Sequence, residues 1–529
     1  MAGRCALMAH TKPTERPDPC VIVIFGASGD LTHRKLIPAL YELHEQGLLP
    51  EQTCVLGIAR TEMSDDDFRE KLVESARDHA QGFEEARWER FAQRIHYHPG
   101  DASEMDAYPG IAKRIEELTA LHKLPASPFG QGNILFYLSV APNLYKPIIQ
   151  CVGGSGLVPE GKRWCAINRD MMTWQRIVVE KPFGEDLAST SSLNRALGRV
   201  FDEDSIFRID HYLGKELVQN ILVMRFANTI FEPVWNRQHI DHVQLTANET
   251  LGVGSRAANF YDGAGAMRDM IQSHLVQVMS LVAMEPPSMH DAEGMSRERI
   301  KVFESARPAP GDLAHEIAAF GRYGAGPGDE PAYIDEKGVN PARKTETFCA
   351  MRVDIDNARW AGVPFYLRSG KKMARKLTEI VVQFKPPPTW LYRDVPPFDT
   401  GERRPPNRII INIAPDDGVS LRFEAKVPGP TVRIDSVKMD MDYSETFDAK
   451  PVEAYGPLLL DAMRGDRMLY KHRDEVEGAW RICQPLLDSA RLREQIQEYA
   501  PGTWGPRSSD ELLERDGRVW HNPVTHEKR

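Results

Sequence analysis

Cysteine is scarce in this sequence and is not arranged in any pattern that would build a structure. Seven cysteines are scattered along 529 residues, an odd number with no C-x-x-C pair among them. This distribution excludes a regular disulfide framework and gives no sign of a structural zinc site. We therefore expect free thiols, a reducing compartment and a cytoplasmic protein.

Long apolar runs are also missing. No stretch approaches the roughly 20 apolar residues of a membrane span. The opening segment, MAGRCALMAHTKPTERPDPC, has too short an apolar core for a secretory signal. We expect no membrane contact and a flexible polar tail over residues 1–18.

Positive charge is not in excess either. The chain has 66 Lys and Arg residues against 76 Asp and Glu residues, a net charge of -10. This balance argues against nucleic acid as the main partner, although a local basic pocket for a small anionic substrate remains open. The length and the 42% hydrophobic content suit a globular protein of two or more domains.

The first half of the chain alternates short β-branched runs with longer helical segments. This rhythm predicts a parallel, doubly wound sheet, that is, an α/β Rossmann-like domain over residues 19–205. The strand candidates are 21–25, 54–58, 94–98, 133–140, 176–180 and 205–209.

From about residue 240 the periodicity changes to alternation of apolar and polar residues, as in 243–247, 419–425 and 437–443. This pattern is typical of a sheet with one wet face. A helical run at 263–285 is expected to cover the other face. We therefore predict an α+β domain over 206–529 with a large, mainly antiparallel sheet, which binds the substrate. An exposed face of this sheet would suit a homodimer or homotetramer.

Two glycines follow the first strand, in V-I-V-I-F-G-A-S-G-D-L at 21–31. Gly26 and Gly29 would let backbone N–H groups approach an anion closely, which indicates a dinucleotide site of variant spacing. Lys35 could add positive charge. Pro38 makes one uninterrupted helix from residue 28 doubtful, because proline is easier to place at a helix start. The alternative is a turn needed only for packing the strand on the helix.

The second strand candidate ends in V-L-G-I-A-R. Arg60 therefore stands where an NAD enzyme usually carries an acid for the ribose 2′-hydroxyl, and an arginine there suits a 2′-phosphate. NADP is preferred over NAD as the cofactor.

Residues 208–216 read R-I-D-H-Y-L-G-K-E. His211 and Lys215 are four residues apart, so they would share one face if this turn is helical. Two such groups can hold a phosphate, although a solvated surface turn is the alternative.

Four blocks together carry a family resemblance: G-A-S-G-D-L at 26–31, V-E-K-P-F-G at 179–184, D-H-Y-L-G-K-E at 210–216 and R-D-M-I-Q-S-H-L at 268–275. In this order they closely resemble the glucose-6-phosphate dehydrogenase family. The resemblance implies NADP-dependent oxidation of D-glucose 6-phosphate to 6-phospho-D-glucono-1,5-lactone, the first step of the oxidative pentose phosphate pathway. The chemistry needs a base and the cofactor, and no metal.

The resemblance also implies the base and its partner. His274 matches the family's base, and histidine is suited to proton transfer near neutral pH. Asp210 matches the carboxylate that orients the imidazole, although a helix N-cap is its alternative reading. Asp269 would lie roughly 140° from His274 around an α-helix, which makes it a poor partner.

The remaining site residues are likewise implied by the resemblance. The substrate ligands would be Lys181, His211, Tyr212, Lys215, Glu249, Asp269, Lys371 and Lys376. The coenzyme groove would involve Gly26, Ala27, Ser28, Gly29, Asp30, Leu31, Lys35, Arg60, Asp101, Ala102, Tyr145 and Lys181. Asn248 and Pro406 stand where some family members place bases for a second, structural NADP, so that site is not assigned.

Two other functions compete with this reading. A non-catalytic regulator that binds NADP or sugar phosphate could use the same fold, but it would have little reason to keep Asp210, Lys181 and His274 together. A hexose-6-phosphate dehydrogenase of a secretory compartment is opposed by the unpaired cysteines and the opening segment.

Overall fold

The computed structural model describes residues 16–126, 132–158, 173–254, 261–308, 313–388, 391–392, 394–395, 406–447 and 455–523. The chain divides into two units, and each is described by itself. Within the described residues, the first unit contains 16–181, Ser192–Ile209 and 455–470. The second contains Pro182–Ser191, 210–447 and 471–523.

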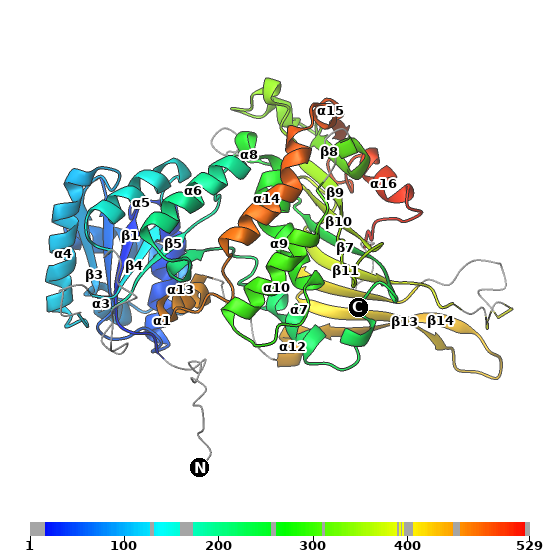
Figure 1. Cartoon of the computed structure of the whole chain (residues 1–529), viewed down its shortest axis with the longest axis horizontal. Helices are drawn as coiled ribbons and strands as arrows, with labels where there is room; N and C mark the ends of the chain where they lie inside the picture. The colour runs from blue at the N-terminus through cyan, green and yellow to red at the C-terminus, as the bar shows by residue number, and fades with distance from the viewer. Residues whose placement is uncertain are drawn as a thin grey trace, which may run out of the picture. The chain divides into compact units, whose positions relative to one another are not determined.

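The first unit is built on a six-stranded parallel sheet (Figure 1). Its order is β3-β2-β1-β4-β5-β6, the strand order of a doubly wound dinucleotide-binding fold. The prediction of a Rossmann-like sheet is confirmed, and each strand overlaps its predicted range. The strands are β1 (Val21–Phe25), β2 (Cys54–Ala59), β3 (Ile95–Pro99), β4 (Ile134–Leu138), β5 (Gln175–Val179) and β6 (Ile206–Arg208).

Helices connect these strands, as a parallel sheet requires. They are α1 (Ile37–Glu45), α2 (Asp65–His79), α3 (Glu85–Ala92), α4 (Tyr108–Leu121), α5 (Tyr145–Gly154) and α6 (Leu187–Val200), of which α6 spans the division between the units. Short turns of helix occur at η2 (Met105–Ala107), η3 (Pro142–Leu144) and η6 (Glu203–Ser205).

A helix from late in the sequence also belongs to the first unit. Helix α13 (Tyr455–Arg464) buries Leu458, Leu459 and Met463 in the same apolar cluster as Ile22 and Leu40. The predicted domain 206–529 contains this segment, so the observed grouping differs from the predicted division there. The physical reason is tertiary packing, because the apolar face of α13 completes the core of the first sheet.

The second unit is built on a mixed, mostly antiparallel sheet of nine strands, which confirms the predicted fold class. The order is β14-β13-β12-β11-β7-β10-β9-β8-β15. Only the β7–β10 and β8–β15 pairs are parallel among the described strands. The strands are β7 (Ile240–Asn248), β8 (Ala318–Tyr323), β9 (Phe348–Asp354), β10 (Pro364–Gly370), β11 (Leu377–Phe384), β12 (Arg408–Ala414), β13 (Gly418–Lys426), β14 (Ile434–Asp442) and β15 (Gln497–Tyr499).

The helical run predicted at 263–285 is present, but in three pieces. They are α8 (Asp262–Ala266), η10 (Met267–Leu275) and α9 (Val276–Ala283). Gly265 has a positive φ of 69° at the junction of the first two. Polar Gln272, Ser273 and Gln277 are buried along with the apolar positions, so the run is covered on all sides from residue 270 to 283.

The other helices of the second unit are α7 (Glu216–Phe226), α10 (Ala292–Ser305), α11 (Ala314–Ile317), α12 (Tyr443–Phe447), α14 (Arg473–Asp488), α15 (Ala490–Glu494) and α16 (Arg507–Glu514). Short turns occur at η7 (Glu232–Val234), η12 (Tyr333–Asp335) and η13 (Pro341–Arg343). In the part of the chain that the structure describes, no helix is long and apolar enough to cross a membrane.

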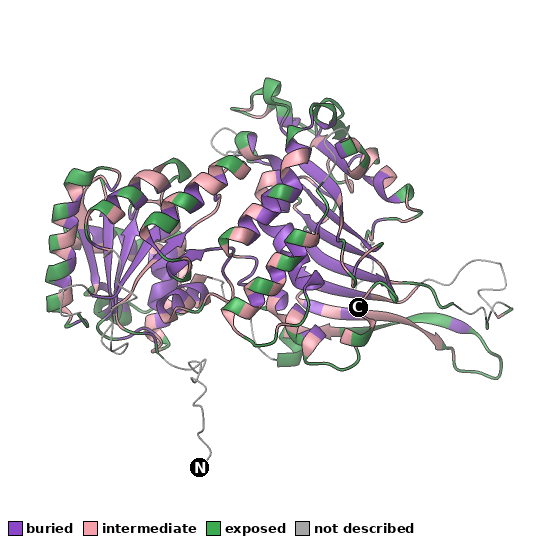
Figure 2. Ribbon diagram, in the orientation of Figure 1, coloured by how far each residue is buried: buried purple, intermediate pink, exposed green. Residues whose placement is uncertain are grey.

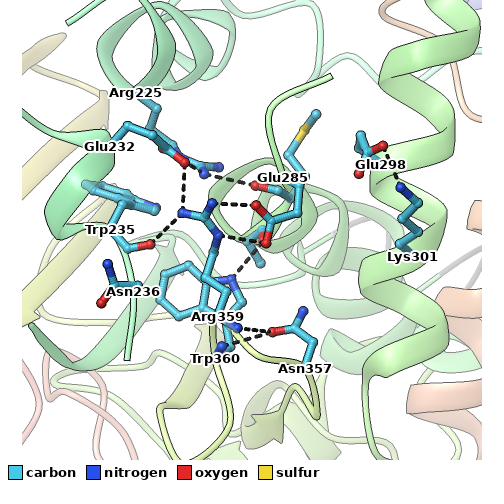
Figure 3. Close-up of polar contacts among 12 residues, drawn as sticks. Arg225, Glu232, Trp235, Asn236, Glu285, Glu298, Lys301, Asn357, Arg359 and Trp360 are labelled. Atoms are coloured by element: carbon cyan, nitrogen blue, oxygen red, sulfur yellow. Dashed lines mark hydrogen bonds and ion pairs between the residues drawn. The ribbon is translucent and has the colours of Figure 1, made fainter. Parts of the chain in front are cut away.

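An ion network fixes the end of α9 (Figure 3). The fully buried guanidinium of Arg225 donates to the carbonyl oxygens of Leu281 and Val282 at 3.0 Å each, and to that of Met284 at 2.9 Å. Arg225 also pairs with Glu232 at 3.2 Å. These carbonyls are the ones a helix end leaves unpaired, so Arg225 anchors the helix that continues from η10.

The outer strands β13 and β14 are much less buried than the inner strands, as Figure 2 shows. Val437 and Met439 of β14 are 36% and 61% exposed. The described residues therefore leave the apolar side of β14 exposed, while the apolar side chains of β13 are partly buried.

Candidate active site

The turn after β1 has a conformation that requires glycine at its first position. Gly26 has a φ of +84°, and a Cβ built there would lie 2.1 Å from the backbone oxygen of Ser139. The Thr32 hydroxyl closes the turn, since it lies within hydrogen-bond distance of Gly26 O at 3.3 Å and Ser139 Oγ at 3.1 Å. The sequence analysis missed Thr32 and Ser139, which stabilise the turn from two segments.

The helix after this turn runs without a break past Pro38. The segment η1 (Thr32–Leu36) has π-type hydrogen bonding, and Pro38 is the second residue of α1. Proline lacks the donor that a regular helix would use there, and the change in hydrogen bonding accommodates it. The helix is therefore continuous, and a local π segment makes this possible despite Pro38.

The other predicted coenzyme residues lie mostly just beyond the carboxyl ends of strands. Exposed Arg60 follows β2, and Asp101 follows β3. Hydrogen bonds from Ser103 and the charge of Arg60 lower the pKa of Asp101. This edge of a parallel sheet is where such folds bind ligands. Tyr145 differs, because it is 1% exposed and donates to Glu180 O at 3.0 Å.

The glycine turn and these neighbours fit a dinucleotide. The turn holds the backbone where a Cβ would collide, and a helix begins at Asp30 immediately after it. A helix start offers backbone N–H groups and a positive dipole to a pyrophosphate. Lys181, two residues after β5, belongs to the same unit.

The second unit contains a buried histidine–carboxylate pair. His274 lies on η10, and its Nδ1 is 2.6 Å from Asp210 Oδ1. His274 is 0% and Asp210 1% exposed. The ring of Tyr212 stacks on His274 with centroids 4.4 Å apart, and the His211 ring approaches it edge-on at 4.6 Å. This packing fixes the plane of the imidazole.

Asp210 also interacts with groups other than His274. Its Oδ1 accepts a hydrogen bond from Tyr212 N at 2.9 Å, and its Oδ2 is 2.8 Å from the ammonium of Lys471. Burial opposes ionisation of Asp210, but the charges of His274 and Lys471 outweigh it and hold its pKa well below the usual value. The sequence analysis missed Lys471, which is distant in sequence and belongs to none of the four motifs.

The turn that contains His211 and Lys215 is not helical. Lys215 is the extended residue before α7, so the idea that a helix face brings the two side chains together is wrong. Packing places them near each other instead: the Lys215 ammonium is 4.1 Å from the Tyr212 ring centre, and the Tyr212 and His211 rings are 5.2 Å apart. Burial lowers the pKa of Lys215, opposed by nearby Asp417.

A second cluster joins Lys371 to two carboxylates. Its ammonium lies 2.6 Å from Glu249 and 3.8 Å from Asp269. The neighbouring Lys372 pairs with Glu330 at 2.9 Å instead. Of these two adjacent lysines, Lys371 is the one that contacts the predicted sugar ligands. Lys376 is exposed, one residue before β11.

The π-type hydrogen bonding of η10 changes the expected relation between Asp269 and His274. Bonds from residue i to i+5 place more residues in each turn, so residues five apart lie closer to one face than in an α-helix. The angle expected from α-helical geometry is therefore wrong. Glu346, which the sequence analysis missed, accepts a hydrogen bond from Met267 N at 3.0 Å at the start of this segment.

Asp210, His211 and His274 each have a ligand-type atom within 4.8 Å of the others, a spacing that a metal ion could use. The Lys471 ammonium competes with any cation for Asp210. Asp210 Oδ1 and His274 Nδ1, which a metal could use as ligands, already pair with each other. The arrangement suits proton transfer better than metal binding.

Comparison with known proteins gives a consistent result. Residues 23–220 match the family described as glucose-6-phosphate dehydrogenase, NAD binding domain, and residues 222–521 match its C-terminal domain. The chain is 42% identical over 511 residues to the glucose-6-phosphate 1-dehydrogenase of Aggregatibacter actinomycetemcomitans, covering 96% of this chain and 98% of that protein. It is 41% identical over 512 residues to glucose-6-phosphate 1-dehydrogenase 2 of Mycobacterium bovis, covering 96% and 95%.

Solved structures agree. A glucose-6-phosphate dehydrogenase in complex with its substrate glucose-6-phosphate superposes with a TM-score of 0.84 at 33% identity, covering 96% of this chain and all of that one. The glucose-6-phosphate 1-dehydrogenase of Mycobacterium avium gives a TM-score of 0.80 at 32% identity, covering 96% and 99%.

Proposed function

The chain belongs to the glucose-6-phosphate dehydrogenase family, and on this premise we propose that it oxidises C1 of β-D-glucose 6-phosphate to 6-phospho-D-glucono-1,5-lactone with NADP. The observation that carries the proposal is the buried His274–Asp210 pair. It lies in the same unit as lysines and carboxylates suited to a sugar phosphate. A non-catalytic regulator is not favoured, because binding alone needs no such pair.

His274 is the base that removes the proton from the C1 hydroxyl. Its Nδ1 is held by Asp210, so Nε2 is the nitrogen that takes the C1 hydroxyl proton. The Asp210 carboxylate fixes the tautomer and stabilises the imidazolium that forms.

Substrate binding divides between the two clusters. Lys215, His211 and Tyr212 hold the phosphate through cationic and donor groups. Glu249 and Asp269 accept hydrogen bonds from sugar hydroxyls, with Lys371 between them and Lys376 nearby.

A nicotinamide dinucleotide is the cofactor class of this family, and the bound cofactor supplies the acceptor for the hydride. Residues 26–31 and Lys35 would bind its pyrophosphate, with Asp101, Ala102 and Tyr145 along the groove. Lys181 would lie between substrate and cofactor. The choice of NADP rests on Arg60, which offers a charge-assisted pair to a 2′-phosphate.

The direct test follows reduced cofactor by absorbance with glucose 6-phosphate and either NADP or NAD. His274→Asn should lower kcat by about 10²–10⁴-fold while substrate affinity survives, because only the base is lost. His239→Asn, at an exposed histidine of the same unit, is the control and should retain activity. Near-wild-type kcat in His274→Asn would show that another group is the base.

The coenzyme choice has its own test. Arg60→Ala should weaken NADP by about tenfold or more and leave NAD nearly unchanged, since only NADP offers the extra phosphate. Arg77→Ala, on an exposed arginine of α2, is the matched control. An equal loss of both coenzymes would make Arg60 structural.

We also propose a homodimer or homotetramer in the cytoplasm. The exposed apolar side chains Val437 and Met439 of β14 support the first point, since exposed apolar surface on a sheet is typical of an interface. The five described cysteines are buried and unpaired, which supports a reducing compartment. Light scattering at several protein concentrations measures the oligomeric state.

A further inference from the structure

Lys471 is a buried cation beside the proposed base. Its side chain is 3% exposed, and it immediately precedes His472, the N-cap of α14. It lies over the Phe183 ring, with its ammonium 5.7 Å from the centroid. A buried ammonium is costly unless it is paired, so its partners reveal what holds it there.

Two polar partners of Lys471 lie directly beside His274. The Lys471 ammonium is 2.8 Å from Asp210 Oδ2, while the other oxygen of the same carboxylate holds His274 Nδ1 at 2.6 Å. The ammonium also donates to the carbonyl oxygen of Ser273, the residue before His274. One cation therefore fixes both the carboxylate that orients the imidazole and the backbone that carries it.

We propose that Lys471 is a positioning residue for the Asp210–His274 pair, which keeps the Asp210 carboxylate ionised and in place and disfavours protonation of His274. The inference rests on the proposed function, in which His274 is the base. The arrangement is a chain of three buried groups, ammonium, carboxylate and imidazole, contributed by three separate segments.

The charge of Lys471 should lower the pKa of His274. Asp210 attracts a proton to His274, and Lys471 opposes that attraction because it shares the same carboxylate. Among the described residues, His211, Tyr212 and Lys215 also face the pair. With Lys471 neutral, His274 should be protonated at higher pH, so the base should be lost earlier as the pH falls.

The test uses the full-length enzyme with Lys471→Met, which keeps the length of the side chain and removes its charge. The acidic limb of the kcat/KM profile should move up by about one pH unit. At a low pH, where kcat/KM falls in both enzymes, the kcat/KM of the variant should therefore be about tenfold below that of the wild type. On the plateau the two values should differ less than about threefold. The Kd for glucose 6-phosphate at plateau pH should stay within about twofold.

A matched control separates this from a merely structural role. Arg299→Met breaks another buried ion pair of the same unit, Arg299–Glu475 at 3.1 Å. It should lower thermal stability and leave the acidic limb in place. An unshifted limb in Lys471→Met, or a weakened substrate affinity with an unshifted limb, would overturn the inference.

Lys471→Arg decides the matter if Lys471→Met does not fold. It keeps the charge, so its limb should stay at the wild-type position even if kcat falls. A limb that moves upward despite the retained charge would overturn the inference. Failure of the proposed function is distinguishable, because it would show as wild-type enzyme without glucose 6-phosphate activity, or as a fully active His274→Asn.

Discussion

Gly26→Ala tests whether the turn after β1 is shaped for a coenzyme. Alanine at a φ of +84° is strained, and its Cβ would lie 2.1 Å from Ser139 O and 2.8 Å from Val140 Cγ1. The strain costs about 1–2 kcal/mol. The contact is with backbone, which cannot rotate away, so displacement costs about 1–3 kcal/mol more.

We therefore expect a loss of about 2–5 kcal/mol in the free energy of unfolding of the first unit. Gly82→Ala is the matched control, because Gly82 has a φ of +66° and no atom within 4 Å of the built Cβ. It should show the backbone strain alone, about 1–2 kcal/mol. The difference between the two losses in the free energy of unfolding measures the cost of the contact with Ser139.

The functional readout is coenzyme affinity by titration calorimetry, with glucose 6-phosphate affinity measured beside it. Relieving the collision with Ser139 requires the turn to move. Such a movement should weaken the affinity for the dinucleotide at least about tenfold, or about 1.4 kcal/mol. Substrate affinity should not change, because the proposed sugar-phosphate ligands belong almost entirely to the other unit. Normal coenzyme affinity in a folded Gly26→Ala variant would refute the assignment of the turn.

Three further predictions concern other named contacts. Arg225→Met should lower the free energy of unfolding by about 3 kcal/mol in denaturant titration, because three buried carbonyls lose a donor at about 1 kcal/mol each. Glu232 keeps its ion pair with Arg359 at 2.8 Å, and breaking the exposed pair at Arg307 should matter far less. Hydrogen bonds from His96 and Tyr97 outweigh burial and lower the pKa of Asp65 to about 2. The ionised Asp65 carboxylate therefore stabilises the fold above about pH 4, and this stabilisation is lost as the pH falls toward 2. Asp65→Asn should thus cost about 2 kcal/mol at pH 7 and nothing below pH 2, by chemical denaturation at both pH values. Lys215→Ala should raise KM for glucose 6-phosphate strongly and leave activity toward glucose unchanged in the same assay, and a shared loss would indicate misfolding.

The parallel sheet could be predicted closely because its signal is local. Strands such as β1 and β4 are short, fully buried apolar runs, and their parallel arrangement follows once each is joined to a helix. The glycine turn was visible for the same reason. The position of α13 was not, since nothing in its amphipathic pattern says which sheet its apolar face will cover.

The site was predictable where a motif carried it and not where packing did. The motifs predicted Asp210 and His274, and the structure places their side chains in contact, although their catalytic roles remain proposals. Lys471 and Glu346 act from outside the four motifs, and a lysine beside a helix start usually indicates a solvated surface. His211 and Lys215 do not share a helix face, because the turn is extended at Lys215.

The charges of the site point to a division of labour among its lysines. The ammonium of Lys371 is already 2.6 Å from Glu249, and that of Lys471 is 2.8 Å from Asp210. A phosphate that approached either would have to compete with a carboxylate in place. Lys215 is different, because the acid that opposes its lowered pKa most, Asp417, is half-buried and its own pKa is raised by burial. A phosphate dianion near Lys215 would offset the effect of burial on its ammonium. This favours Lys215 over Lys371 and Lys471 as the proposed ligand of the substrate phosphate.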